Sequence, residues 1–274
     1  DSLINIGTGS LLIAKKRYPD IHIQTYLQNI ETMTRELRAK LSPHLIPAEI
    51  ISTINEYLFV EKGFQYNKGV HYLNQVIDRK CGSCVGLSTL YLALTQRLKL
   101  PCFSVRIPRH EFVRYSTEVI NINIELMEQG AQFSDDHYIA ANKISTVAIK
   151  KKVYLQNLSI KKTLALILNN RGNDYRLESK YDEAIRDFNL VLSIDSNSTD
   201  TYYSRGLAYT ENGQHEEGIK DCTMALDLDP GCAYAYANRG VAYNNKGDHE
   251  GALADFNSAL NLDNRLANVY NNRG

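Results

Sequence analysis

The stretch that decides the N-terminal fold covers residues 80–94 and reads Lys80-Cys81-Gly82-Ser83-Cys84-Val85-Gly86-Leu87-Ser88-Thr89-Leu90-Tyr91-Leu92-Ala93-Leu94. Apolar residues at positions 87, 90, 91, 94 and 98 have the spacing of a buried helix. The Gly-Ser pair fits the turn that enters this helix, which puts Cys84 at the helix N-terminus. Unpaired backbone N–H groups and the helix dipole favour a thiolate there, and the same groups can stabilise an oxyanion. The segment therefore predicts a cysteine nucleophile.

Three segments that follow this helix are rich in β-branched and aromatic residues and predict strands, at 103–107, 110–115 and 119–125. If Ser116 and Thr117 form a two-residue turn, His110 lies directly opposite Asn123. Directly opposed residues share a face of the sheet, with Cβ atoms about 4.5–5.5 Å apart.

The predicted site is a triad in which Cys84 is the nucleophile, His110 the base and Asn123 the residue that orients the imidazole ring. Asn121 lies on the same predicted face as Asn123 and is the alternative third member. Asn74 is a candidate oxyanion donor. The other interpretations are that Cys84 is an inert core cysteine and that His110 is an ordinary strand residue.

The residues before the cysteine predict helices. Residues 9–41 form two helical segments separated by a break at Tyr18-Pro19-Asp20, and Ser42-Pro43 ends the second. Pro47 begins a further helix that reaches residue 60, and residues 72–80 form another. The N-terminal half is thus helices followed by a mixed α and β core.

The C-terminal half repeats itself every 34 residues. Six series keep one register, among them Arg171-Gly172, Arg205-Gly206, Arg239-Gly240 and Arg273-Gly274. The period and pattern resemble the tetratricopeptide repeat, in which each unit is a helix pair and neighbouring units bury one core. Three full repeats are predicted at 165–198, 199–232 and 233–264, followed by a truncated fourth. In each full repeat the arginine is followed 16 residues later by an aspartate. This spacing favours an Arg–Asp ion pair that joins the two helices of the repeat; the alternative is a strip of arginines that binds a ligand.

The resemblance implies a groove lined by the first helix of each pair, and a protein or peptide partner. The predicted groove residues are polar or apolar side chains on these helices: Asn169, Asn173, Tyr203, Leu207, Val241, Asn244 and Asn245. Relatives that grip a C-terminal carboxylate generally have Lys where this chain has Asn169, so that clamp is not expected. The alternative is an array that only spaces or oligomerises the other domain.

Charge and cysteine counts exclude several classes of protein. The chain has 31 Lys and Arg against 31 Asp and Glu, which argues against general nucleic-acid binding. The longest uncharged stretch, residues 81–96, is too short and too polar to span a membrane, and no signal peptide is visible. Five cysteines in a chain of this size favour a reducing, cytoplasmic compartment.

The Cys81-Gly-Ser-Cys84 motif also matches a redox pair, but no thioredoxin-like strand precedes it. It lacks the second pair that a zinc site needs. No metal and no cofactor is therefore expected.

Residues 9–160 resemble the transglutaminase-like superfamily of cysteine enzymes, in the bacterial branch that often carries tetratricopeptide repeats. The motifs that carry this resemblance are Leu12-Ile13-Ala14, Tyr57-Leu58-Phe59, Tyr72-Leu73-Asn74, Gly82-Ser83-Cys84, Pro108-Arg109-His110 and Asn123-Ile124-Glu125. Two positions depart from the family: relatives often have Asp in place of Asn123 and Gly in place of Arg109.

The resemblance implies an α+β papain-like or transglutaminase-like domain over residues 1–160, with a helical part over 1–60 and the Cys/His core over 61–160. An all-α tetratricopeptide-repeat superhelix follows over 161–274. The implied chemistry is acyl transfer through a thioester at Cys84, ending in amide hydrolysis (protease or amidase) or in transamidation. The competing hypothesis is a non-catalytic interaction scaffold with the same fold.

Overall fold

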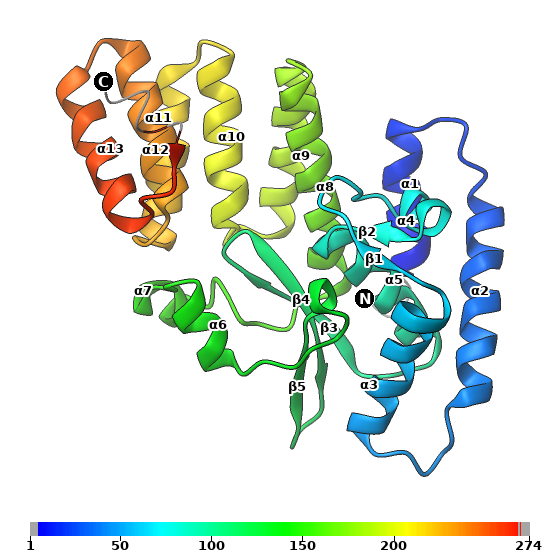
Figure 1. Cartoon of the computed structure of the whole chain (residues 1–274). Helices are drawn as coiled ribbons and strands as arrows, with labels where there is room; N and C mark the ends of the chain where they lie inside the picture. Colours follow the sequence, from blue (N-terminus) through cyan, green and yellow to red (C-terminus); the bar gives the residue numbers. More distant parts are fainter. Residues whose placement is uncertain (1–4, 268, 270–274) are drawn as a thin grey trace. The chain divides into compact units, whose positions relative to one another are not determined.

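The computed structural model describes residues 5–267 and 269 of the 274 residues. They form two compact units, shown in Figure 1. The first holds the described residues up to 138 together with 156–167, and the second holds 139–155 and the described residues from 168 onward. Two helices, α6 (Asp135–Ala141) and α8 (Ile160–Leu177), run from one unit into the other. The predicted domain boundary after residue 160 falls at the first turn of α8.

The first unit opens with helices and then alternates short strands with helices. In chain order its elements are α1 (Ile6–Arg17), α2 (Ile23–Lys40), α3 (Pro47–Asn55), a π-helix (Glu56–Glu61), β1 (Gln65–Tyr66), α4 (Leu73–Arg79), β2 (Cys81–Gly82), α5 (Cys84–Arg97), β3 (Cys102–Ile107), β4 (His110–Ser116), β5 (Asn121–Ile124) and a 3-10 helix (Leu126–Glu128). The predicted helices, the break at residues 18–20 and the three strands are confirmed.

The strands form two small sheets. β1 and β2 pair in parallel, with Tyr66 opposite Gly82. β3, β4 and β5 form an antiparallel sheet in that order, so β4 is its central strand. The chain therefore passes from the parallel pair directly into α5 and then into the antiparallel sheet.

Helix α5 is the centre of this unit, because residues Val85 to Thr95 are all buried. It packs against α1, α2 and α4, and its other side contacts β3 and β4. A helix that is buried on all sides needs no polar face, and the mostly apolar run from Leu87 to Leu94 satisfies this requirement. Within the described part of the chain, no helix is both long enough and apolar enough to cross a membrane.

The second unit is the repeat array. After α7 (Thr146–Lys150) its helices are α9 (Tyr181–Ile194), α10 (Thr199–Glu211), α11 (His215–Leu228), α12 (Ala233–Lys246) and α13 (His249–Leu262), with the C-terminal part of α8 before them. Figure 1 shows α9 to α13 side by side. Three helix pairs, α8–α9, α10–α11 and α12–α13, match the three predicted repeats. The predicted fourth repeat, with Arg273-Gly274, lies largely outside the described residues.

Each pair is held together by small residues and an ion pair. A Cβ added to Gly172 would lie 2.7 Å from the Phe188 ring, and one added to Gly240 would lie 2.6 Å from the Phe256 ring. The guanidinium of each repeat arginine donates two hydrogen bonds of 2.6–2.9 Å to the aspartate 16 residues later: Arg171 to Asp187, Arg205 to Asp221 and Arg239 to Asp255. The predicted helix-locking pair is confirmed.

Residues 139–155 contact the array at several points, one of which is a buried repeat aspartate. Ser145 donates a hydrogen bond of 2.6 Å to Oδ1 of Asp229, and Tyr154 donates one of 3.2 Å to Oδ2 of the same carboxylate. Asp229 is 3% exposed, so these bonds satisfy a buried charge.

Candidate active site

Cys84 is the first residue of α5, as the sequence predicts. Ser83 caps the helix: its Oγ accepts a hydrogen bond of 3.2 Å from the backbone N–H of Gly86 and lies 3.0 Å from Nδ1 of His71. Cys84 forms no disulfide and is half-buried. The backbone N–H groups of Cys84 and Val85 lack partners within the helix and are available to a ligand next to the sulfur.

Close packing fixes where the helix begins. A Cβ on Gly86 would lie 2.7 Å from the carbonyl oxygen of Val70 and 2.9 Å from Cγ2 of Val76. The backbone N–H of Ser83 donates a hydrogen bond of 2.7 Å to the same carbonyl of Val70. The sulfur of Cys84 is therefore carried by a helix end with little freedom to move.

His110 is the first residue of β4 and pairs with Ile107 across a tight turn. Arg109, the residue before it, has φ of +59°, a region that favours glycine. Arg109 therefore adopts a backbone conformation that glycine adopts at lower cost.

The His110 ring is hydrogen-bonded to a carboxylate and is influenced by the Cys84 thiol. Its Nε2 lies 2.7 Å from Oε2 of Glu125, and Cys84 acts on its pKa. Burial alone would lower the pKa of His110, but the hydrogen bonds and charges of Cys84 and Glu125 outweigh burial and raise it to about 10. Because Glu125 occupies Nε2, Nδ1 is the ring nitrogen that remains for another partner.

The carboxylate of Glu125 is buried and held by three donors. Its Oε2 accepts from His110 and, at 3.1 Å, from the hydroxyl of Tyr138, and its Oε1 accepts from the backbone N–H of Met127 at 3.1 Å. Only 5% of the residue is exposed. Glu125 can therefore fix the orientation of the imidazole ring and balance a positive charge on it.

The predicted partner of His110 was wrong. Asn123 pairs with Arg114 across the strands, and Asn121 pairs with Ser116. The predicted two-residue turn is instead a loop over residues 117–120, closed by a hydrogen bond from the N–H of Thr117 to the carbonyl of Ile120. The longer loop shifts the register by four residues.

Asn123 belongs to a neighbouring cluster. Its Oδ1 accepts a hydrogen bond of 2.7 Å from Arg114, and its Nδ2 donates to Oδ1 of Asp135 and to the carbonyl of Phe133. Asn121 instead accepts from the hydroxyl of Ser116. Neither asparagine contacts the imidazole ring. Asn123 holds the start of α6 against the sheet.

Two residues near the site escaped the sequence analysis. Glu125 lies two residues after Asn123, and alternate residues share a face of the sheet. A shift of the predicted strand register by an even number of residues therefore brings Glu125 near His110 on that same face. Tyr66 lies opposite Gly82 in the parallel pair, and burial together with the charges of Cys84 and Glu125 raises its pKa. A search for a carboxylate on that face would have found Glu125.

Asn74 is the second residue of α4, a helix that packs against α5. It is 7% exposed, and its Oδ1 has no hydrogen-bond partner among the residues that the structure describes. Its role as an oxyanion donor stays a prediction.

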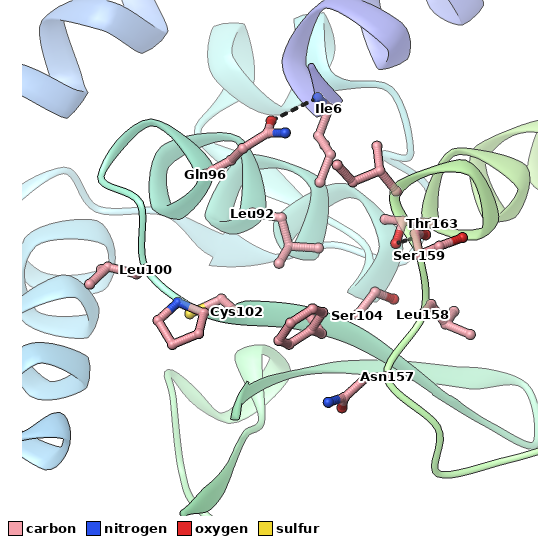
Figure 2. Close-up of a pocket in the computed structure, with 13 residues that line it drawn as sticks. Ile6, Leu92, Gln96, Leu100, Cys102, Ser104, Asn157, Leu158, Ser159 and Thr163 are labelled. Atoms are coloured by element: carbon pink, nitrogen blue, oxygen red, sulfur yellow. Dashed lines mark hydrogen bonds between the residues drawn. The ribbon is translucent and has the colours of Figure 1, made fainter. Parts of the chain in front are cut away.

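A separate cavity of about 450 Å³ lies on another side of α5. Figure 2 shows it between Leu92 and Gln96 of α5, Cys102 of β3 and residues 157–163, with the N–H of Ile6 donating a 3.0 Å hydrogen bond to Gln96 at its edge. Its lining does not include Cys84, His110 or Glu125. Burial raises the pKa of Cys102 to about 12, so this thiol is a poor nucleophile.

The seven predicted groove residues are half-buried or exposed on α8, α10 and α12. Some are already engaged within the array. Oδ1 of Asn169 accepts from Thr201 at 2.9 Å, and Nδ2 of Asn173 donates to the carbonyl of Asn169 at 3.0 Å. The ring of Tyr203 stacks with that of Tyr234, with centroids 6.0 Å apart.

Comparisons with known proteins place both halves of the chain. The profile of the transglutaminase-like superfamily matches residues 24–169, and tetratricopeptide-repeat profiles match residues 172–213, 199–232 and 233–266. Proteins named UPF0162 from two strains of Xylella fastidiosa, Temecula1 and 9a5c, are each 28% identical over 120 residues, which are 42% of this chain. The match spans 43% of those relatives' own length.

Among solved structures, the first tetratricopeptide-repeat domain of human RPAP3 is 28% identical, with a TM-score of 0.39 over 40% of this chain and 86% of that one. The second such domain of human RPAP3, solved with an HSP70 peptide, is 30% identical, with a TM-score of 0.38 over 40% and 91%. The superfamily profile covers more than half of the chain, including the helix that begins at Cys84 and the strand that begins at His110. The chain belongs to the transglutaminase-like superfamily and carries tetratricopeptide repeats after that domain.

Proposed function

We propose that this chain is a cysteine-dependent acyl-transfer enzyme with Cys84 as nucleophile, His110 as acid and base, and Glu125 as the orienting carboxylate. The observation that carries the proposal is the His110 ring, whose Nε2 lies 2.7 Å from Oε2 of Glu125 and whose pKa is raised by both Cys84 and Glu125. A carboxylate in the third position supplies the charge that the amide of Asn123 lacks.

The proposed reaction has two halves. The Cys84 thiolate attacks the carbonyl carbon of an amide, and the oxyanion that forms faces the N–H groups at the start of α5. The C–N bond then breaks, His110 gives its proton to the leaving amine, and a thioester remains on Cys84. Water or a second amine attacks this thioester while His110 takes its proton. The C–S bond then breaks and Cys84 leaves as the thiolate, which restores the starting state. Water gives hydrolysis and an amine gives transamidation.

The test is the pH dependence of Cys84 alkylation by iodoacetamide, read by peptide mass spectrometry. The wild type should label fast near pH 6, and His110→Ala should need pH above about 8. His44→Ala is the matched control, because this exposed histidine lies in the loop between α2 and α3. Its profile should match the wild type.

Slow labelling of the wild type that rises only above about pH 8, unchanged in His110→Ala, would contradict the proposal and favour a scaffold. Cys81 lies on the same peptide, so fragmentation must assign the label to one sulfur. A Cys81→Ser variant checks this assignment. Burial raises the pKa of Cys102, Cys222 and Cys232, so these thiols should stay unlabelled.

We also propose that the array binds a protein or peptide partner through the first helices of its pairs. The tetratricopeptide-repeat match and the half-exposed Tyr203, Leu207 and Val241 support this. In a peptide-library selection, the full chain should enrich related sequences, and Tyr203→Ala with Val241→Ala should lose them. Equal enrichment by Met224→Ala, on an exposed side chain of α11, is the control. Failure of the wild type to enrich any sequence would leave a spacer as the role of the array.

A further inference from the structure

Tyr138 is a buried residue of α6 whose hydroxyl reaches the candidate active site. It is 4% exposed and donates a hydrogen bond of 3.1 Å to Oε2 of Glu125, the same oxygen that faces His110 at 2.7 Å. Burial and the nearby Glu125 raise the pKa of Tyr138, so the hydroxyl keeps its proton and acts as the donor.

The ring of Tyr138 is fixed independently of this hydrogen bond. It stacks on Phe112 with centroids 4.2 Å apart and planes 4° apart, and it meets Phe133 edge-on at 6.1 Å. Phe112 lies two residues after His110 on β4, and therefore on the same face of the strand. The strand that carries the base thus also carries the platform for Tyr138.

We propose that Tyr138 is a positioning residue for this site: by sharing Oε2 of Glu125 with His110, its hydroxyl sets how much negative charge the carboxylate presents to the imidazole. The inference rests on the function proposed above. A donor that bonds to a carboxylate disperses its charge, and in a buried site this effect is weakly screened by water.

Removing the hydroxyl should therefore make the local potential more negative. A more negative potential favours the protonated forms of both the imidazole and the thiol. The other titratable groups near this cluster come from several elements and are unchanged by the substitution: Cys84 of α5, Tyr66 of β1, Glu111 of β4, Glu128 of the 3-10 helix, and Asp135 and His137 of α6.

The experiment compares Cys84 alkylation against pH in the wild type and in Tyr138→Phe. Phenylalanine keeps the ring that stacks on Phe112 and removes only the hydroxyl. The midpoint of the profile should move up by about 0.5 to 1 pH unit, and histidine-ring NMR should show His110 protonated to higher pH. Tyr154→Phe is the matched control, since Tyr154 is also buried and donates to a carboxylate, Asp229, in the other unit.

A second measurement shows whether the effect acts through the carboxylate. In a Glu125→Gln background there is no charge to disperse, so adding Tyr138→Phe should leave the midpoint unchanged. An equal shift in both backgrounds would overturn the inference, as would a Tyr138→Phe profile that superimposes on the wild type. A profile that responds to His110→Ala and not to Tyr138→Phe refutes only this inference. A profile that responds to neither refutes the proposed function and this inference with it.

Discussion

At the scale of single residues, Glu111 is a buried acid beside the site that the proposed chemistry does not use. It follows His110 on β4 and lies opposite Arg106 on the neighbouring strand, on the other face from the imidazole. Its Oε1 accepts a hydrogen bond of 2.5 Å from Ser104, and its Oε2 has no partner among the described residues. Burial raises the pKa of Glu111 to about 8, and the bonds and charges around it offset this only in part.

This acid should make the free energy of unfolding depend on pH. Because the folded chain holds the Glu111 proton more tightly than the unfolded chain, stability falls as pH rises from about 4.5 to about 8. Glu111→Gln removes that dependence, so its advantage over the wild type should grow across this range by at most about 1.4 kcal/mol per pH unit. Urea unfolding at pH 5, 6.5 and 8 measures it. A constant difference between the two proteins would contradict the prediction.

The residue types of the site could be predicted from the sequence, but not all of its members. Cys84 could be located because a helix start leaves a local pattern, and His110 because it begins a strand rich in β-branched residues. The contact between His110 and Glu125 depends on the length of a loop, for which Ser116 and Thr117 give no turn signal. The sequence therefore predicted on which face of the sheet the partner of His110 lies, but it indicated Asn123 and not Glu125.

At the scale of elements, α5 is positioned by contacts that leave no room for a side chain at Gly86. Gly86→Ala should lower the free energy of unfolding by about 1–3 kcal/mol, because the new methyl would lie 2.7 Å from a backbone carbonyl that cannot yield easily. It should also slow Cys84 alkylation, since the helix start must shift. Urea unfolding and the labelling rate are the measurements.

Gly69→Ala is the control for this prediction. Gly69 lies before α4, next to Val70, whose carbonyl is the group close to Gly86. A Cβ added to Gly69 would lie 3.7 Å from its nearest atom. That variant should be as stable as the wild type or slightly more stable, because alanine restricts the unfolded chain. Equal losses in the two variants would show that the close approach at Gly86 carries no special cost.

Helices and strands of this chain were predictable where their periodicity is long. The helix that begins at Ile23 and the buried helix α5 carry several turns of pattern. The two-residue strands β1 and β2 carry none, because a parallel pair of this size is defined by its partner and not by its own residues. Because Tyr66 lies in one of these short strands, the sequence did not predict that it is near Cys84.

At the scale of the whole molecule, the array depends on buried charges that must stay paired. Asp221 and Arg205 have side chains 7% and 17% exposed, and the guanidinium also lies over the rings of Tyr202 and Tyr209. Asp221→Ala leaves the half-buried guanidinium of Arg205 without its counterion. It should therefore lower the free energy of unfolding of the array by about 2–4 kcal/mol. Cys84 alkylation should not change.

Glu216→Ala is the matched control, since its pair with Lys246 is exposed to solvent and contributes little. Chemical denaturation followed by circular dichroism reports the array, which supplies most of the long helices. If both variants lose the same stability, burial of the Arg205 pair is not what matters.

The 34-residue period made the architecture of the array predictable before any contact was known. A pattern that is weak in one repeat becomes clear when it recurs at a fixed period. Gly172 and Gly240 thus mark the same helix-crossing position, which one repeat alone would leave ambiguous. The packing of residues 139–155 against Asp229 had no such signal, because it occurs in one repeat alone.

The three bidentate Arg–Asp pairs each join two helices of one repeat, so each of these arginines has its counterion within the same 34-residue unit. A gene duplication or deletion of one whole unit then adds or removes a neutral pair and never separates one of these arginines from its aspartate. The length of the array is therefore a trait that recombination can vary at little cost in folding. A new unit also brings another groove-lining helix, so the size of the binding surface can change while the cysteine domain stays the same.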